Sequence, residues 1–372
     1  MKKDVGIMTF HRAQNYGSVL QAYALQQTIL KLGKSCEIID FSNERQKEMY
    51  LPFTKNDNIK HFVRNIITSF HLKTFKRHYN DFEEFLKNHL ILSKDSYSTY
   101  DSLVGIEKNY NCLLAGSDQV WNIKCYDADD AYFLGFAKDV KKVAYAPSFG
   151  AKNLLTYADD IDKYKNYLQD FSNISIREKN GQKWLNELLG YDVPIYVDPS
   201  FLLTKSEWEK MIGEPMIKGK YILYYSFHYS TQISKTVKEL SKKFGLPVYI
   251  LSARAQYYYG GQALGFKLVE HSGPLEFLNA IKHATIIFTN SFHGAAFSTI
   301  LHKKFYFLYG NVQNKDDDRA TFLIEQLGIQ ECVVKMDELD RIVLEQTFDY
   351  DNAEKILKPL RDEAVKYLCD VL

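Results

Sequence analysis

The sequence lacks the cysteine patterns that mark disulfide-bonded, zinc-binding or redox proteins. It contains five cysteines in 372 residues, and no two of them form a CxxC pair. An odd number of scattered thiols is typical of a reducing compartment, and no group of histidines and cysteines has zinc-ligand spacing. We therefore predict no metal site, and we expect Cys36 and Cys112 to pack inside strands.

The sequence also lacks long apolar runs. No stretch approaches the roughly 20 residues needed to span a bilayer. The N-terminal residues lead directly into a strand that is too short for the apolar core of a signal peptide. We expect a cytoplasmic protein.

An excess of charge of one sign is missing as well. The chain has 47 Lys and Arg against 46 Asp and Glu, a formal net charge of +1. Nucleic-acid binding needs a strongly basic face, so we expect no nucleic-acid partner. Neither a Walker loop nor a GxGxxG loop occurs, and we predict no cofactor.

What the sequence does have is an alternation of strand-like and helical segments along almost the whole chain. This pattern is typical of parallel α/β layers, and 372 residues are too many for one hydrophobic core. We predict a first lobe over residues 1–205, a second lobe over 206–345, and a C-terminal helix over 346–372 that crosses back onto the first lobe. The predicted strands are Val5–Phe10, Cys36–Phe41, Asn111–Leu114, Val143–Ala146, Ile174–Ile176 and Ile195–Val197, followed by Tyr221–Ser226, Val248–Ser252, Phe266–Val269, Thr285–Thr289 and Phe305–Leu308.

Two helical segments stand apart from this alternation. A helical insert of about residues 58–90 interrupts the first lobe, and from Lys60 to Arg77 it carries five basic residues and no acid. A basic amphipathic helix can contact a membrane surface or an anionic polymer, whereas such charge runs are more often a solvated face over an apolar core stripe. The C-terminal helix contains Pro359, which should kink or split it.

The turn Thr289–Ala295 is the strongest candidate for a site. It follows an apolar strand and opens a helix, and unpaired N–H groups at a helix start suit an anion such as phosphate or carboxylate. His293 adds a group that can carry a proton near neutral pH. Its small neighbours Ser291 and Gly294 allow a ligand to approach closely.

The N-terminus repeats this arrangement. A strand runs into a loop that ends Asn15-Tyr16-Gly17 and continues into a helical pattern from Ser18 to Leu32. Two such turns at opposite ends of the chain predict two lobes that face a shared cleft.

Polar residues follow three more of the predicted strands. Ser117 and Asp118 end an apolar strand, where ligands bind in open α/β sheets. Asp118 is either a general base or a charge that faces a cationic transition state, or it caps the following turn. The partner of Arg177 is either a protein carboxylate such as Glu178 or an anionic group of a ligand. We interpret Asp198, before Pro199, as a structural turn residue.

Several of these segments together resemble the polysaccharide pyruvyl transferase family. They are Thr9-Phe10-His11 with Asn15-Tyr16-Gly17, Gly116-Ser117-Asp118-Gln119-Val120-Trp121-Asn122, Ser175-Ile176-Arg177-Glu178, Val197-Asp198-Pro199 and Thr289-Asn290-Ser291-Phe292-His293-Gly294. Arg319, at the start of a predicted helix, is similar to the C-terminal arginine of the family. The order and spacing of these segments match over nearly the whole chain.

The resemblance implies a GT-B-like pair of Rossmann-like lobes. It also implies transfer of the enolpyruvyl group of phosphoenolpyruvate onto two hydroxyls of a sugar, free or lipid-linked, to form a pyruvate ketal on a polysaccharide or its precursor. The donor-binding arginine and histidine of the family correspond to Arg177 and His293. Many members have an acid where this chain has Ser18, so Asp118 is the remaining candidate for an acid or base.

The predicted site therefore has two parts. The catalytic candidates are His293, which would bind the phosphate and protonate it as it leaves, and Asp118, and the substrate-binding candidates are Asn15, Tyr16, Gly17, Ser117, Arg177, Ser291, Gly294 and Arg319. The alternative functions are a GT-B glycosyltransferase that uses a nucleotide sugar and a non-catalytic family member that binds saccharide. Peripheral contact with the inner face of the membrane is the alternative to a freely diffusing cytoplasmic protein.

Overall fold

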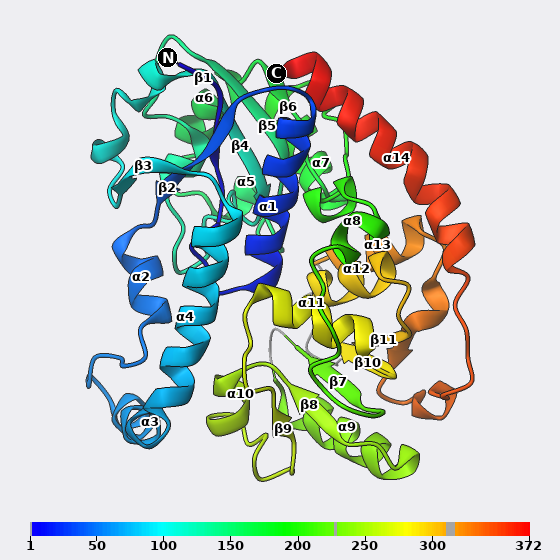
Figure 1. Cartoon of the computed structure of the whole chain (residues 1–372). Coiled ribbons are helices and arrows are strands. Elements are labelled where there is room, and N and C mark those ends of the chain that lie inside the picture. The colour runs from blue at the N-terminus through cyan, green and yellow to red at the C-terminus, as the bar shows by residue number, and fades with distance from the viewer. Residues whose placement is uncertain (1, 227–228, 310–316) are drawn as a thin grey trace.

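The chain folds into two α/β lobes, each built on a parallel sheet (Figure 1). The structure, a computed structural model, describes residues 2–226, 229–309 and 317–372. Within these ranges each lobe contains one six-stranded sheet covered by helices on its faces. The predicted α/β class with two Rossmann-like lobes is confirmed.

The first lobe holds the sheet of order β3-β2-β1-β4-β5-β6. Its strands are β1 (Lys3–Met8), β2 (Cys36–Phe41), β3 (Leu92–Tyr97), β4 (Tyr110–Asp118), β5 (Lys141–Pro147) and β6 (Asn173–Ile174). The helices up to the second sheet are α1 (Tyr16–Lys31), α2 (Glu44–Tyr50), α3 (Ile59–Phe70), α4 (Leu72–His89), α5 (Leu154–Tyr157), α6 (Ile161–Gln169), α7 (Lys179–Leu189) and α8 (Lys205–Glu209).

The second lobe holds the sheet of order β12-β11-β10-β7-β8-β9. Its strands are β7 (Ile222–Tyr225), β8 (Val248–Ile250), β9 (Lys267–Leu268), β10 (Ile286–Thr289), β11 (Phe305–Tyr309) and β12 (Val333–Lys335). The helices are α9 (Thr231–Phe244), α10 (Ala253–Tyr257), α11 (Pro274–His283), α12 (Phe292–Ile300), α13 (Arg319–Gln326) and α14 (Tyr350–Val371).

The two sheets have the same winding. In each, the order counted from the first strand of the lobe is 3-2-1-4-5-6, so the direction of winding reverses between β1 and β4 and between β7 and β10. Ligands of such sheets bind beyond the carboxyl ends of the strands at this reversal. The loops after β1, β4 and β10 are the segments in which the sequence predicts the site.

The lobes are joined by an apolar core, one cluster of which contains buried side chains from both sheets. The ring of Tyr16, at the start of α1, stacks on Phe277 of α11 with ring centroids 4.8 Å apart, and it meets Tyr225 of β7 edge-on. Trp208 of α8 packs edge-on against Phe297 of α12. Because these large rings are buried between the lobes, the carboxyl edges of the two sheets are held close together.

The helix α14 runs along one side of the molecule from the second lobe to the first (Figure 1). Its Tyr367 donates a hydrogen bond to the carbonyl of Ala144 in β5, and Arg361 donates one to the carbonyl of Phe201. The prediction that Pro359 splits this helix is wrong, because α14 is continuous from Tyr350 to Val371. Buried residues on both sides of the proline hold the two halves on the same surface.

Two other expectations differ from the structure. Residues 195–197 do not form a strand of the sheet, since only Ile195 pairs with Ile176, in an isolated bridge. The edge strands β3 and β12 were not predicted, because edge strands carry polar residues and lack a continuous apolar run. The chain passes between the sheets after β6 and before β7, an interval that contains the predicted boundary at 205–206. That boundary stays a prediction.

The buried ring of Tyr16 provides a test of the interlobe core. Tyr16→Ala should lower the free energy of unfolding by about 3 kcal/mol or more, because it leaves a cavity against Phe277. Tyr16→Phe should cost much less, since it keeps the buried ring and removes only the phenol oxygen, which lies 3.5 Å from the Leu251 carbonyl. Urea unfolding measures both, with Tyr126→Ala, at a position 58% exposed, as the control. Equal unfolding midpoints for Tyr16→Ala and the control would contradict this account of the core.

Candidate active site

A cavity of about 430 Å³ lies between the carboxyl edges of the two sheets. Its lining comes from the loops after β1, β4 and β5 in the first lobe, and from the β10–α12 turn and the start of α13 in the second. Of the predicted site residues, the lining includes Asn15, Asp118, Ser291, His293 and Arg319. The tertiary structure thus brings together residues that are about 300 positions apart in the sequence.

Arg177 is the centre of a buried ion cluster beside this cavity. Its Nη1 donates to Asp198 Oδ2, and its Nη2 donates to Asp118 Oδ1 over 3.2 Å. The Nε atom lies 3.7 Å from Glu178 Oε2. The guanidinium also lies over the ring of Phe292, at 4.8 Å from its centroid. Arg177 is therefore paired with protein carboxylates here, and it is not among the residues that line the cavity.

The two aspartates of the cluster stay ionised. Burial raises the pKa of Asp118, but the opposite charges of Arg177 and His293 and a hydrogen bond from Ser18 outweigh it and lower that pKa below its usual value. The pKa of Asp198 is lowered as well: burial raises it, but attraction to His293 and to Arg177 and a hydrogen bond from the N–H of Ser200 prevail. A carboxylate with a depressed pKa is a weak base, so Asp118 is better suited to stabilise positive charge than to take up a proton.

Glu178 behaves in the opposite way. It is fully buried, and burial raises its pKa to about 7, although Arg177 and Arg319 act to lower it. Its Oε1 accepts a hydrogen bond from the backbone N–H of Phe149, over 2.8 Å. The carboxyl group of Glu178, which lies beside Arg177, is therefore expected to titrate near neutral pH.

His293 lies in the first turn of α12. The side chain of Ser291 caps this helix by accepting from the N–H of Gly294. A Cβ at residue 294 would lie 2.2 Å from Thr289 Oγ1, so glycine is needed for the helix to start this close to the end of β10. The remaining N–H groups of the first turn have no partner inside the helix and, with the helix dipole, favour an anion in the cavity.

The imidazole of His293 is held from two sides. Its Nε2 lies 3.6 Å from Asp198 Oδ2, and on the other side the ring packs against the backbone of Gly17, where a Cβ would lie 2.0 Å from Nδ1. The side chain of Asn15 caps α1 by accepting from the N–H groups of Gly17 and Ser18. The first turn of α1 thus supports the histidine of the second lobe, and its own N–H groups are partly occupied by the cap.

Residue 18 is a serine where many members of the family that the sequence resembles have an acid, and its contact with Asp118 gives a structural reason for the difference. Its hydroxyl donates to Asp118 Oδ2. An acid at residue 18 would place a second carboxylate against that atom. In this chain the hydroxyl instead helps to keep the Asp118 carboxylate charged.

Two cations line the other walls of the cavity. Arg319, at the start of α13, pairs with both carboxylate oxygens of Asp317 over 2.7 Å, and this pairing raises its pKa against the effect of burial. Lys152 lies in the loop after β5, with its ammonium 4.9 Å from the centroid of the Tyr157 ring. These cations and the start of α12 form the part of the cavity that is suited to an anion.

The remaining predicted residues have other surroundings. Tyr16 lies in the interlobe core and not in the cavity lining. The hydroxyl of Ser117 donates to the carbonyl of Ala146 and lies 3.3 Å from Asp198 Oδ2. Their assignment as substrate-binding residues stays a prediction.

Asp198 and Lys152 were missed by sequence reasoning. Asp198 does cap the turn before Ser200, as predicted, but its second oxygen joins the ion cluster. The available signal for Lys152 was its place in the loop after β5, since the residues after parallel strands gather at one edge of a sheet. Asp198 offered less, because the apolar segment before it does not form a strand of the sheet.

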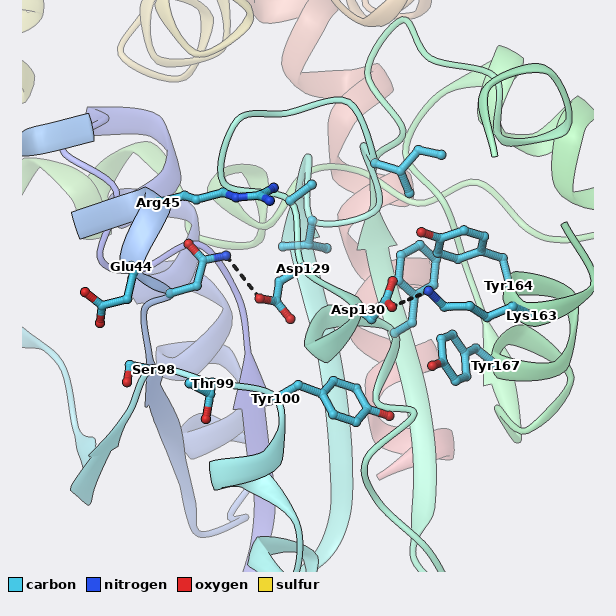
Figure 2. Close-up of a pocket in the computed structure, with 15 residues that line it drawn as sticks. Glu44, Arg45, Ser98, Thr99, Tyr100, Asp129, Asp130, Lys163, Tyr164 and Tyr167 are labelled. Carbon is cyan, nitrogen blue, oxygen red and sulfur yellow. Dashed lines mark hydrogen bonds and ion pairs between the residues drawn. The ribbon is translucent and has the colours of Figure 1, made fainter. Parts of the chain in front are cut away.

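A larger cavity, of about 670 Å³, is lined by loops at the carboxyl edge of the first sheet (Figure 2). Its wall carries the rings of Tyr100, Tyr164 and Tyr167. The ammonium of Lys163 pairs there with Asp130, and the amide of Asn43 donates to Asp129. The start of α2 lines this cavity, but the Arg177 ion cluster and His293 are not among its lining residues, so size alone does not make it the catalytic cavity.

The fold places the protein in the class of GT-B-like, two-lobed α/β proteins, and solved structures of that class share it. MnaA of S. aureus, in a co-structure with UDP, is 12% identical over 98% of this chain and 90% of that chain, with a TM-score of 0.53. UDP-N-acetylglucosamine 2-epimerase from Rickettsia bellii is 11% identical over 100% and 97%, with a TM-score of 0.51. At these identities the likeness concerns the fold alone.

The family is defined by the sequence. The chain belongs to the polysaccharide pyruvyl transferase family, whose model matches residues 15–311. Membership in a family of transferases implies an enzyme. Among curated proteins, none matches the sequence significantly. Within the described ranges, no helix has the length and apolar character of a transmembrane span.

The raised pKa of Glu178 predicts a pH-dependent stability difference. Between about pH 4.5 and pH 7 the unfolded chain ionises this group while the folded chain keeps it protonated, so its contribution lowers the free energy of unfolding as pH rises. Glu178→Gln removes this contribution, and its stability relative to wild type should increase from about pH 5 to about pH 8, by up to ~3 kcal/mol. Urea unfolding across this pH range is the measurement. Glu363→Gln, at an exposed position of α14, serves as the control, and curves for Glu178→Gln and wild type that stay parallel would rule out a buried carboxyl group with this pKa.

Proposed function

We propose that this protein transfers the enolpyruvyl group of phosphoenolpyruvate onto two hydroxyls of a sugar, forming a pyruvate ketal on a polysaccharide or its precursor. Family membership supports a pyruvyl transferase. The observation that carries the finer proposal is the arrangement of His293 at the start of α12, with Asp118 and Arg319 on the walls of the same cavity. This combination offers an acid or base, a fixed negative charge and an anion site within one pocket.

The donor would bind through its two anionic groups. Phosphoenolpyruvate carries a phosphate and a carboxylate, so it needs cations and oriented N–H donors. The first turn of α12 suits the phosphate, and Arg319 and Lys152 lie on the same cavity for the remaining negative charge. Arg177 does not line the cavity, and both of its Nη atoms donate to aspartates, so we assign it to positioning Asp118 and Asp198.

The reaction needs one proton at carbon and one at the leaving phosphate. Protonation of the methylene carbon develops positive charge at the adjacent carbon, which the first sugar hydroxyl attacks. Phosphate then leaves, and the second hydroxyl closes the ketal ring. The two protons lost by the hydroxyls balance the one gained by the methyl group and the one gained by phosphate.

The residues take distinct roles in these steps. Asp118 stays ionised and lies on the cavity wall, so it would stabilise the cationic carbon. His293 would carry the proton for the departing phosphate, with its ring oriented by Asp198 and Gly17. Asp198 remains bound to Arg177 while its carboxylate faces the imidazole, so it would hold the ring in place.

The choice of donor separates this proposal from a nucleotide-sugar glycosyltransferase. Phosphoenolpyruvate at about 100 times its Kd should raise the free energy of unfolding by about 2.7 kcal/mol, because it binds only the folded state. A uridine or guanosine diphosphate sugar should give no shift. Thermal unfolding with each compound is the measurement. The opposite pattern of shifts would favour the glycosyltransferase.

The reaction itself is tested by phosphate release from phosphoenolpyruvate with a panel of free and lipid-linked glycans, with mass spectrometry of the product. His293→Ala should reduce the rate by at least ~10²-fold while the fold persists, because Asp198 keeps its contact with Arg177. The control is His271→Ala, at a largely exposed histidine of the second lobe. Near-normal turnover of His293→Ala would remove the assigned role, and saccharide binding without phosphate release would support the non-catalytic alternative.

A further inference from the structure

The helix α3 in the first-lobe insert is oriented with its apolar side toward solvent. Five of its large apolar residues repeat at the spacing of one helix face and are exposed: Ile59 (82%), Phe62 (55%), Val63 (47%), Ile66 (43%) and Phe70 (82%). Among its large apolar residues only Ile67 is half-buried. In a helix that covers a core, this stripe would face inward. The interpretation of the stripe as core holds for Phe75 of α4 and is wrong for α3.

Polar contacts fix α3 in this orientation. Asn65 exchanges hydrogen bonds with the backbone of Thr54, and the hydroxyl of Thr68 bonds the phenol of Tyr258, beside α10. The guanidinium of Arg64 lies over the ring of Tyr258, 5.6 Å from its centroid. The side of α3 that faces the protein is thus the polar side, and turning the apolar stripe inward would break these contacts.

The exposed stripe is surrounded by positive charge. From residue 58 to residue 80 the sequence contains five lysines and arginines and no acid. Lys60, Lys73 and Lys76 are exposed, whereas Arg77 pairs with Glu270 of the second lobe. The flanking acids are engaged: Asp57 bonds His61, and Asp81 bonds His271 and the N–H of Ser272. The surface around α3 is therefore basic, although the whole chain carries a net charge of only +1.

The exposed apolar stripe and the lysines around it together indicate which kind of surface could cover α3. In a symmetric dimer through α3, each copy would bring its own Lys60 and Lys73 against those of the other, and like charges would oppose association. An anionic lipid surface accepts apolar side chains between its headgroups and attracts each lysine. We propose that α3 docks on an anionic membrane surface, with Phe62 and Phe70 inserted at the headgroup level and Lys60, Lys73 and Lys76 above them.

The position of α3 in the fold is consistent with this role. Figure 1 shows α3 at a tip of the molecule, at the far end of α4 from the first sheet. A cavity of about 460 Å³ beside it is lined by His61 and Arg64 and also by Arg254 and Tyr258 of the second lobe. A further cavity shares Arg254 with it and reaches Gln14, the neighbour of Asn15 in the candidate site. The docking surface thus lies beside a cavity that is lined by residues of both lobes, and its assignment does not depend on the proposed reaction.

Vesicle sedimentation with the full chain tests the proposal. The protein should bind vesicles of phosphatidylcholine and phosphatidylglycerol in equal parts, and bind vesicles of pure phosphatidylcholine far more weakly. The double variant Phe62→Ser and Phe70→Ser should reduce the partition coefficient at least about tenfold. Replacing Lys60 and Lys73 by Gln should reduce it about fivefold for each lysine, an effect that salt should also produce in the wild type.

Matched controls use exposed residues outside the insert. Val104→Ser, at a position 64% exposed, and Lys355→Gln with Lys358→Gln on α14 should leave the partition coefficient unchanged. All changed side chains are exposed, so the melting temperatures should match that of the wild type. Failure of the wild type to bind anionic vesicles would overturn the proposal, as would equal binding by the Phe62 and Phe70 variant. A concentration-dependent dimer that this variant abolishes would assign the surface to a second copy of the chain instead.

Discussion

The charge of Arg177 is the constraint on which the candidate site depends. Its guanidinium holds Asp118, from the end of β4, and Asp198, from the segment between the sheets, as ionised groups inside the protein. Two buried carboxylates without a cation would repel each other and would favour their neutral forms. Because Asp198 also lies 3.6 Å from the imidazole of His293, this cluster links the first lobe to the second through a polar contact as well as through packing.

Close packing between the lobes, in addition to the Arg177 ion cluster, positions the groups at the cavity. Tyr16 is buried between the lobes, and the next residue, Gly17, lets the backbone of α1 touch the imidazole. The groups at the cavity are therefore held in place by the packing of the two lobes, and groups positioned in this way need little reorganisation when charge develops in a reaction. The same closeness explains why Ser18 can bond Asp118 from the first turn of α1.

Regular patterns in the sequence predicted most of the helices and strands. The predictions that failed are those in which a local signal, such as a proline or an apolar stripe, was outweighed by tertiary contacts. Continuous apolar runs predicted the central strands because parallel strands are buried on both faces. Pro359 is a residue that disfavours a helix interior, yet α14 continues through it, because packing on both sides of the proline outweighs one lost hydrogen bond. The amphipathic pattern of α3 predicted a helix correctly, yet periodicity cannot tell whether an apolar stripe faces a core or solvent. That depended on polar contacts from Thr54 and Tyr258, the second of which is distant in sequence.

The sequence by itself determined the class of fold, the family, and the strand ends that carry Asp118, Arg177 and His293, since these follow from local periodicity and from ordered motifs. Only the tertiary structure decided which groups are partners. Arg177 pairs with two aspartates, Asp198 belongs to the ion cluster as well as to its turn, and Tyr16 lies in the core. The physical reason is that burial and charge pairing depend on residues far apart in the chain. These residues come within hydrogen-bond distance only when the chain has folded and the carboxyl ends of the strands of the two sheets face each other.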